Sequence, residues 1–302
     1  MSSGSLTDMF KQSAISPYEE VISFEYLYSQ EGATFKKIVD KTVRANKLPS
    51  EALKDEFGFF MPDGMTEIES LIQSKLGKLS VSVKNTPSWP SKLADSEHPT
   101  PLFYYYGDIG LLDILDSKAI SIVGSRKASP YGLGRAAEIA GELSKSGFTI
   151  VSGLAAGIDT SALSSSIANN GHVIGVIGTP IDECYPKQNC NLQKEIAENH
   201  LLISQVPFYR YSMQPFKTKR YYFPERNELM AAISDATLII EASDTSGTLS
   251  QARACLHQHR PLFILKSCYE NQNITWPKVW AEKENVYVVD SAEDIIKHMR
   301  RL

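Results

Sequence analysis

Short, uninterrupted apolar runs alternate with longer amphipathic segments over the C-terminal two thirds of the chain. The runs lack the polar alternation of a half-exposed strand, which predicts strands buried on both faces, as in a parallel sheet covered by helices. The segments between them, such as Leu133–Ser146 and Leu249–Gln258, have the length and pattern of helices. The predicted strands are Ala119–Val123, Phe148–Val151, Val173–Ile177, Leu201–Val206, Ala236–Ile240, Pro261–Leu265 and Val286–Val289.

Repeated strand–helix units of this kind predict an α/β fold with a doubly wound, mostly parallel sheet over Ala119–Leu302. Ligands of such sheets bind beyond the carboxyl ends of the strands. The loops that follow the predicted strands are therefore the places to look for chemistry.

The N-terminal segment Met1–Lys84 has a different texture. Apolar residues recur there at intervals of three and four in the runs Tyr18–Tyr28, Thr34–Arg44 and Met65–Leu76, which predicts a small helical domain. The residues between the two domains, Asn85–Lys118, form a proline-rich connector that contains one short predicted strand, Leu102–Tyr106.

Composition narrows the class of protein without naming a function. The 302 residues carry a net charge of −4, which excludes a uniformly basic protein and leaves room for a local basic patch. No apolar run approaches the roughly 20 residues that span a bilayer, and no secretion signal is recognisable, so we predict a cytoplasmic protein. The four cysteines form no CxxC pair, from which we expect reduced thiols, no structural zinc and no cofactor.

Two strand-end loops are rich in glycine. Gly124, Ser125 and Arg126 follow the first strand of the sheet, where glycine backbone and an arginine suit a phosphate, although a tight turn with a solvated arginine fits the pattern equally well. In the second loop we expect the backbone of Ser152 and Gly153 to approach a ligand and Asp159 to cap the next helix.

Two further loops carry polar side chains. Lys187 and Asn189 lie in the third loop, for which a simple solvated loop is the alternative. The fourth loop, Glu241–Thr248, places small hydroxyl residues at a helix start and suits a phosphate or a sugar. Its candidate ligand residues are Ser246, Gly247 and Thr248.

The segment Pro207–Arg226 is basic and aromatic within a net-acidic chain. It has five cations and the single acid Glu225. The aromatic residues interleaved with the cations are Tyr209, Tyr211, Phe216, Tyr221, Tyr222 and Phe223. Cations bind phosphates and exposed rings stack on unpaired bases, so the segment points to single-stranded nucleic acid, although some rings, Phe223 especially, are expected to pin the loop to the core. The cations are Arg210, Lys217, Lys219, Arg220 and Arg226.

Taken in order, the motifs resemble the DprA/Smf family of DNA-processing proteins. The matching stretches are PSWPSKL, IVGSRKASPYG, VSGLAAGIDTSAL, IGTPIDECYPKQN, FPERN and EASDTSGTLSQA. The resemblance implies an extended Rossmann-like domain that binds single-stranded DNA, forms a homodimer and helps to load a RecA-type recombinase in DNA processing and natural transformation. By position it implies a DNA pocket made of Gly124, Ser125, Arg126, Ser152, Gly153, Lys187, Phe223, Arg226, Asn227, Ser246 and Gly247.

Several residues depart from the family pattern. Ala156 replaces an arginine, Leu163 a histidine, Gln205 a glutamate and Glu228 an arginine. Losing about two cations is expected to weaken DNA binding several-fold. No winged-helix sequence follows Leu302, so we expect that common C-terminal module to be missing.

Two other functions stay open at this point. A divergent member of the family also fits the regulatory or antitoxin half of a phage-defence or toxin–antitoxin pair, with a toxin or effector as its partner. A nucleotide-binding or nucleoside-monophosphate-hydrolysing Rossmann enzyme is the enzymatic alternative, with Glu241 as its only attractive carboxylate, but no convincing acid/base pair accompanies it. A non-enzymatic DNA-binding protein is our leading hypothesis.

Overall fold

The computed structural model of the protein describes residues 15–300, apart from 59–62, 76, 78, 95, 98, 115 and 116. The first 14 residues, the last two, and residue 76 at the end of the third amphipathic run lie outside the described residues. Within the described part of the chain, no helix is both long and apolar enough to cross a membrane.

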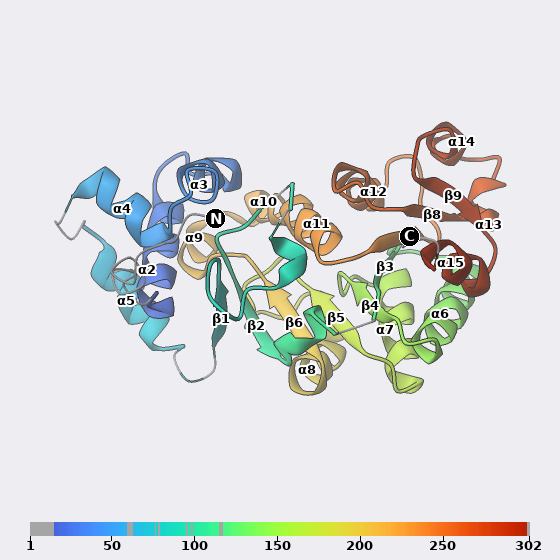
Figure 1. The fold of residues 1–302 in the computed structure, drawn as a ribbon, viewed down its shortest axis with the longest axis horizontal. Coiled ribbons are helices and arrows are strands. Elements are labelled where there is room, and N and C mark those ends of the chain that lie inside the picture. Colours follow the sequence, from blue (N-terminus) through green and yellow to red (C-terminus); the bar gives the residue numbers. More distant parts are fainter. Residues whose placement is uncertain are drawn as a thin grey trace, which may run out of the picture.

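One nine-stranded sheet runs through the centre of the molecule (Figure 1). Its spatial order is β1-β2-β6-β5-β4-β3-β7-β8-β9, and all neighbours from β6 to β9 are parallel, whereas β1 and β2 are antiparallel additions at one edge. This confirms the doubly wound, mostly parallel sheet. The strands are β1 (Ser80–Val83), β2 (Leu102–Gly107), β3 (Ala119–Val123), β4 (Thr149–Ser152), β5 (Val173–Val176), β6 (Leu201–Ser204), β7 (Ala236–Ile239), β8 (Leu262–Leu265) and β9 (Val286–Val289).

Helices cover both faces of the sheet, as uninterrupted apolar strands require. In Figure 1, α6, α7 and α8 lie below the sheet and α10, α11 and α12 above it. Each face has its own hydrophobic core, and successive residues of β3 alternate between the two: Ile122 belongs to one and Val123 to the other. The sheet helices are α6 (Pro130–Lys145), α7 (Ile158–Ala168), α8 (Cys190–Asn199), α9 (Phe208–Met213), α10 (Phe216–Lys219), α11 (Tyr222–Ala232), α12 (Thr248–His257), α13 (Lys266–Tyr269), α14 (Trp276–Ala281) and α15 (Ala292–Met299).

The strand order reverses between β3 and β7. From β3 the chain adds β4, β5 and β6 on one side, and it then returns to place β7 on the other side of β3. The loops that leave β3 and β7 therefore diverge at their carboxyl ends and open a crevice, which is where doubly wound sheets bind ligands.

The N-terminal region is helical, as predicted, and lies at one end of the long axis (Figure 1). It consists of α2 (Pro17–Ser29), α3 (Phe35–Lys41), α4 (Pro49–Phe57) and α5 (Met65–Gln73). Helix α4 was not among the predicted runs; it begins at Pro49, whose missing N–H has no intrahelical partner to lose in the first turn. Strand β1 also falls within the segment expected to be helical, and a division at residue 84 would separate β1 from its partner β2.

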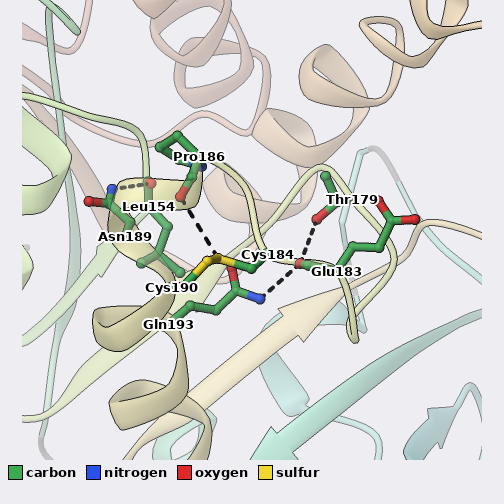
Figure 2. The surroundings of a disulfide bond; sticks show 8 residues. All are labelled: Leu154, Thr179, Glu183, Cys184, Pro186, Asn189, Cys190 and Gln193. Atoms are coloured by element: carbon green, nitrogen blue, oxygen red, sulfur yellow. Dashed lines mark hydrogen bonds between the residues drawn. A yellow bond between two sulfur atoms is a disulfide. The ribbon is translucent and has the colours of Figure 1, made fainter.

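The expectation of four reduced thiols is wrong for one pair. Cys184 and Cys190 form a disulfide across the loop that follows β5 (Figure 2), and their Cα atoms are 5.5 Å apart. The loop folds back on itself and brings the two residues within the range that a disulfide bridges, which six residues of sequence separation do not reveal. Cys255 and Cys268 are free and buried, and burial raises the pKa of the Cys255 thiol to about 12.

Candidate nucleic-acid interface

A cleft of about 820 Å³ opens where the strand order reverses. Its walls come from the loops after β3 and β7 on one side and from α9, α10 and α11 on the other. The cleft thus joins residues of all four predicted strand-end loops to the basic, aromatic segment. Of the predicted site residues, it is lined by Gly124, Ser125, Arg126, Lys219, Arg220, Phe223, Arg226, Asn227, Ser246, Gly247 and Thr248.

The outer part of the cleft, which we call the rim, presents cations beside aromatic rings. The Arg126 guanidinium lies 5.7 Å from the ring centre of Phe223, and the Lys219 ammonium lies 4.0 Å from that of Tyr211. Arg220 sits in the same way over Tyr221, at 5.3 Å. These distances are those of cation–π pairs, which hold a cation in place and leave its outer side free for a phosphate.

Two rings near the cations of the rim are strongly exposed. Phe216, which lines the cleft, is 82% exposed, and Tyr221 next to Arg220 is 62% exposed. Apolar rings of this size are usually buried unless they serve a contact. Their position beside Lys219 and Arg220 suits bases that stack on them while the phosphates meet the cations.

The inner part of the cleft, which we call the floor, is built around Arg226. This side chain is only 6% exposed, and its guanidinium donates to the carbonyl oxygens of Gly153 and Val176 at 2.7 Å and to Asn227 Oδ1 at 2.9 Å. Burial lowers the pKa of Arg226 to about 10, against the opposite pull of the Asp159 carboxylate. Arg226 is therefore charged at neutral pH and already bonded within the protein.

Asp159 does not cap the helix, contrary to the prediction. Helix α7 begins at Ile158 after Gly157, so Asp159 lies within the first turn, and its carboxylate accepts from the backbone N–H groups of Gly153 and Ala155. Burial raises its pKa, and the nearby charge of Arg226 opposes that rise. The residue therefore fixes the loop after β4 and compensates the charge of Arg226.

Three predicted residues have their hydrogen-bonding groups engaged inside the protein and do not line the main cleft. The Ser152 hydroxyl donates to the Ile122 carbonyl at 2.6 Å, and Gly153 bonds Asp159 through its N–H and Arg226 through its carbonyl. The amide of Asn189 donates to the Leu154 carbonyl, as Figure 2 shows, at 2.8 Å. We predicted that a ligand approaches the backbone of Ser152 and Gly153. The Ser152 hydroxyl and the Gly153 N–H are already bonded within the protein, and Gly153 lines only a small side pocket.

The other cations of the predicted set are dispersed. Lys187 and Lys217 are exposed but do not line the cleft. Arg210 turns away from it and donates to the carbonyl oxygens of Tyr28 and Gln30 in the N-terminal region. Of the five cations of Pro207–Arg226, Lys217 and Arg220 are thus exposed and Lys219 is half-buried, whereas Arg210 and Arg226 are bonded to backbone carbonyl oxygens.

The two helix starts beside the crevice differ in how they are occupied. At the start of α6, the Glu241 carboxylate accepts from the N–H and the hydroxyl of Ser129, which accounts for Glu241 without catalysis. At the start of α12, the Ser246 and Thr248 hydroxyls bond each other, and Thr248 also donates to the Gly124 carbonyl. No carboxylate is bonded at this second start among the described residues, which leaves it the more favourable end for an anion.

Sequence reasoning missed the residues that complete the cleft walls. Lys127 adds a cation beside Arg126, and Tyr211 supports Lys219. Tyr185, from the disulfide-closed loop, packs at 5.9 Å against Phe223, which in turn fills the space where Gly178 has no side chain. Only the interleaving of rings and cations in the sequence hinted at these contacts.

The four departures from the family pattern fall in different places. Ala156 lines the small side pocket that shares Arg126, Phe223 and Arg226 with the cleft. The arginine of the family pattern would therefore add a cation near the cleft, and alanine does not. Leu163 is fully buried in the core, and Gln205 is buried with no hydrogen-bond partner for its amide. Glu228 does not line the cleft and lies 3.8 Å from His257 of α12.

Comparison with known proteins places the sheet and cleft in a family. The model of the family described as DNA recombination-mediator protein A matches residues 80–300. DNA processing protein DprA of Bacillus subtilis is 28% identical over 259 residues, which cover 86% of this chain and 83% of that protein. Protein Smf of Synechocystis is 39% identical over 183 residues, which are 59% of this chain and 44% of that protein.

Two solved structures share the fold. DprA from Streptococcus pneumoniae superposes with a TM-score of 0.73 at 25% identity, over 94% of this chain and 98% of the other. DprA from Helicobacter pylori, studied for its single-stranded DNA binding mode, gives a TM-score of 0.62 at 28% identity, over 74% of this chain and 96% of the other. The first match includes the N-terminal helices as well as the sheet.

Proposed function

Because the chain belongs to the DNA recombination-mediator protein A family, the DprA/Smf proteins, we propose that it binds single-stranded DNA. The binding site is the cleft between β3 and β7. The observation that carries the proposal is the rim, where Arg126, Lys219 and Arg220 each stand over an aromatic ring. The protein acts in DNA processing and recombination.

The rim favours single strands over duplex for a physical reason. Bases in a duplex are stacked on one another and turn only their edges outward, whereas Phe216 and Tyr221 offer ring faces to unpaired bases. The cations contact the sugar–phosphate backbone, which is the same for every sequence, so binding is strong at low salt and weakly sequence-dependent. The start of α12 accepts a further phosphate.

Titration with a labelled oligothymidylate tests this proposal. Wild-type protein should bind the oligothymidylate at low salt and bind a duplex of equal length more weakly. Arg126→Ala should weaken binding about fivefold or more, and Lys187→Ala, an exposed lysine that does not line the cleft, should leave it unchanged. Absence of wild-type binding at low salt contradicts the proposal, and equal effects of the two variants move the site away from the cleft.

Partners follow from recombination mediation. We propose a RecA-type recombinase as the protein partner and a homodimer as the assembly, on the strength of the family description alone. Sedimentation of the protein at several concentrations tests the dimer, and displacement of a single-strand-binding protein from oligothymidylate by recombinase, with and without this protein, tests the mediation. A toxin or effector partner has no observation in its favour and is not part of the proposal.

We propose that the protein works without catalysis of its own. Glu241, the carboxylate on which the nucleotide-hydrolase alternative depended, is bonded to Ser129 at the start of α6. Asp159, which does line the cleft, is buried, and its carboxylate is bonded to backbone N–H groups. Release of free base from nucleotides by purified protein, abolished by Glu241→Gln, would restore the enzymatic alternative.

A further inference from the structure

Helix α9, which begins the segment that carries the rim, is held by a carboxylate from the N-terminal helices. Glu25 of α2 is fully buried, and its two oxygens accept the backbone N–H groups of Phe208 and Tyr209, each at 2.9 Å. These are the first two residues of α9, whose own N-cap, Pro207, offers no side-chain hydrogen bond. The hydroxyl of Tyr104 from β2 donates to the same carboxylate at 2.6 Å.

A second tie runs in the opposite direction. The Arg210 guanidinium of α9 donates to the carbonyl oxygens of Tyr28 and Gln30, both at 2.9 Å. These carbonyls belong to the end of α2, where helix carbonyls lack intrahelical partners and favour a cation. Each helix therefore satisfies a terminus of the other.

Further contacts keep the start of α9 in one place. The centre of the Phe208 ring lies 4.9 Å from that of the Tyr104 ring. The ammonium group of Lys75, a residue that follows α5, lies 4.6 Å from the centre of the Phe208 ring. The Tyr209 hydroxyl donates to Glu67 of α5 at 2.9 Å. The N-terminal region and the sheet edge thus enclose the first turn of α9.

The other end of α9 reaches the cleft. Tyr211 is one turn beyond Phe208, lines the cleft, and supports Lys219 at 4.0 Å and Tyr222 at 5.6 Å. The N-terminal helices supply no lining residue of the cleft among residues 15–58 and 63–75. Helix α9 is therefore a direct route by which these helices can influence the cleft.

We propose that Glu25 and Arg210 are positioning residues for nucleic-acid binding, through which the N-terminal helical region sets the place of the rim that carries Tyr211 and Lys219. The inference rests on the proposed function and extends it, because it makes a region outside the cleft part of the binding apparatus. Without Glu25, three buried donors lose their acceptor, and α9 shifts to regain hydrogen bonds with water.

The chain supplies a matched control in the same helix. Glu20 is also buried, and its carboxylate accepts from the N–H of Ser50 at 2.9 Å and from its hydroxyl at 2.7 Å. Both donor groups belong to Ser50, which lies within the N-terminal region. Like Glu25→Ala, Glu20→Ala removes a buried glutamate from the N-terminal region. Unlike Glu25→Ala, it leaves the hydrogen bonds between α2 and α9 intact.

The test is a double-mutant cycle on the affinity for labelled oligothymidylate, measured with full-length protein over a salt series. Glu25→Ala should weaken binding about fivefold and lower the salt slope, while Glu20→Ala should leave both unchanged. In the background Lys219→Ala/Arg220→Ala, Glu25→Ala should have no further effect, because the groups that it positions are gone. Loss of folded protein alone lowers the apparent affinity without changing the salt slope. Should Glu25→Ala fail to fold, Arg210→Ala, at a half-buried position, takes its place in the same cycle.

The outcomes separate the two proposals. Normal binding and an unchanged salt slope for Glu25→Ala, or an effect that persists in full in the Lys219→Ala/Arg220→Ala background, overturn the positioning role and leave the proposed function standing. Wild-type protein that does not bind the oligothymidylate overturns the proposed function and the inference with it.

Discussion

The floor and the rim of the cleft hold similar residues that do different work. Arg226 of the floor is buried, and its N–H groups donate hydrogen bonds to Gly153, Val176 and Asn227. Arg126 of the rim is exposed and lies over the ring of Phe223. The floor is a satisfied network that keeps the loops after β4 and β5 together. The rim is a set of cations with outward-facing charge. A cation in a binding motif is therefore a ligand group only where its donors remain free.

The largest expected effect comes from breaking the floor. Arg226→Met should destabilise the protein by about 3–5 kcal/mol, because it leaves Asp159 as a buried charge without its partner and removes donors from two carbonyls. Urea unfolding measures the change. Arg220→Met at the rim is the control and should stay within about 0.5 kcal/mol of wild type. Equal losses in the two variants would erase the distinction between floor and rim.

The buried tie beneath the rim should make stability depend on pH. Burial raises the pKa of Glu25 to about 7, against the opposing hydrogen bond from Tyr104, so between pH 4.5 and 7 the folded protein holds a proton that the unfolded chain has released. Stability should therefore fall as pH rises through this window, by about 1.4 kcal/mol per pH unit and about 3 kcal/mol in all. Unfolding free energies at pH 5 and pH 7 measure it, and Glu25→Gln should flatten the difference. A wild-type profile identical to that of Glu25→Gln would show that Glu25 does not titrate in this range.

The wall between floor and rim should respond to reduction. The disulfide closes the loop that carries Tyr185, and opening so short a loop should cost about 2 kcal/mol of stability. Urea unfolding with and without a reductant measures this cost in the wild type. The variant Cys184→Ser/Cys190→Ser should show the lower stability under both conditions. A wild type that is insensitive to reductant under conditions that open the bond would place the wall outside the folding unit.

The smallest effect in energy is the one that defines the rim. Lys219→Ala should weaken oligothymidylate binding by about 1 kcal/mol and lower the salt slope by about 0.7, with no change in stability. Lys217→Ala, two residues away and outside the cleft lining, is the matched control and should change neither quantity. A salt slope that drops equally for both would indicate a diffuse basic surface instead of a rim.

The sequence predicted the sheet well because burial on both faces leaves a plain record. Every residue of the strand Ala119–Val123 is buried, and all of them are apolar except Ser121, whose hydroxyl is hydrogen-bonded to that of Ser234; the strand boundaries are those of the predicted run. Helix α4 was not predicted, because proline ends a helix as readily as it begins one, and only the hydrogen bonds of the turn after Pro49 show that a helix starts there.

The sequence predicted which loops and cations form the cleft, but not which of the cations are bonded within the protein and which are available to a ligand. Composition reveals that Arg210, Lys219 and Arg226 are cations, but not that two of them are bonded internally. The link from Glu25 to Phe208 joins residues 183 positions apart and leaves no local pattern. Asp159 lies near a helix start, where an acidic residue is expected to cap the helix. Its carboxylate instead accepts hydrogen bonds from N–H groups of the loop before the helix.

The most direct test of the account is to map where a single strand lies on the protein. Photo-cross-linking with an oligothymidylate that carries 5-bromodeoxyuridine, followed by mass spectrometry of the peptides, reports which side chains contact the bases. The account predicts cross-links in residues 207–226, at Phe216 and Tyr221 above all, and their loss on Phe216→Ala/Tyr221→Ala with Arg126 intact. Cross-links concentrated elsewhere, for example on α3 or α14, would contradict the placement of DNA in the cleft.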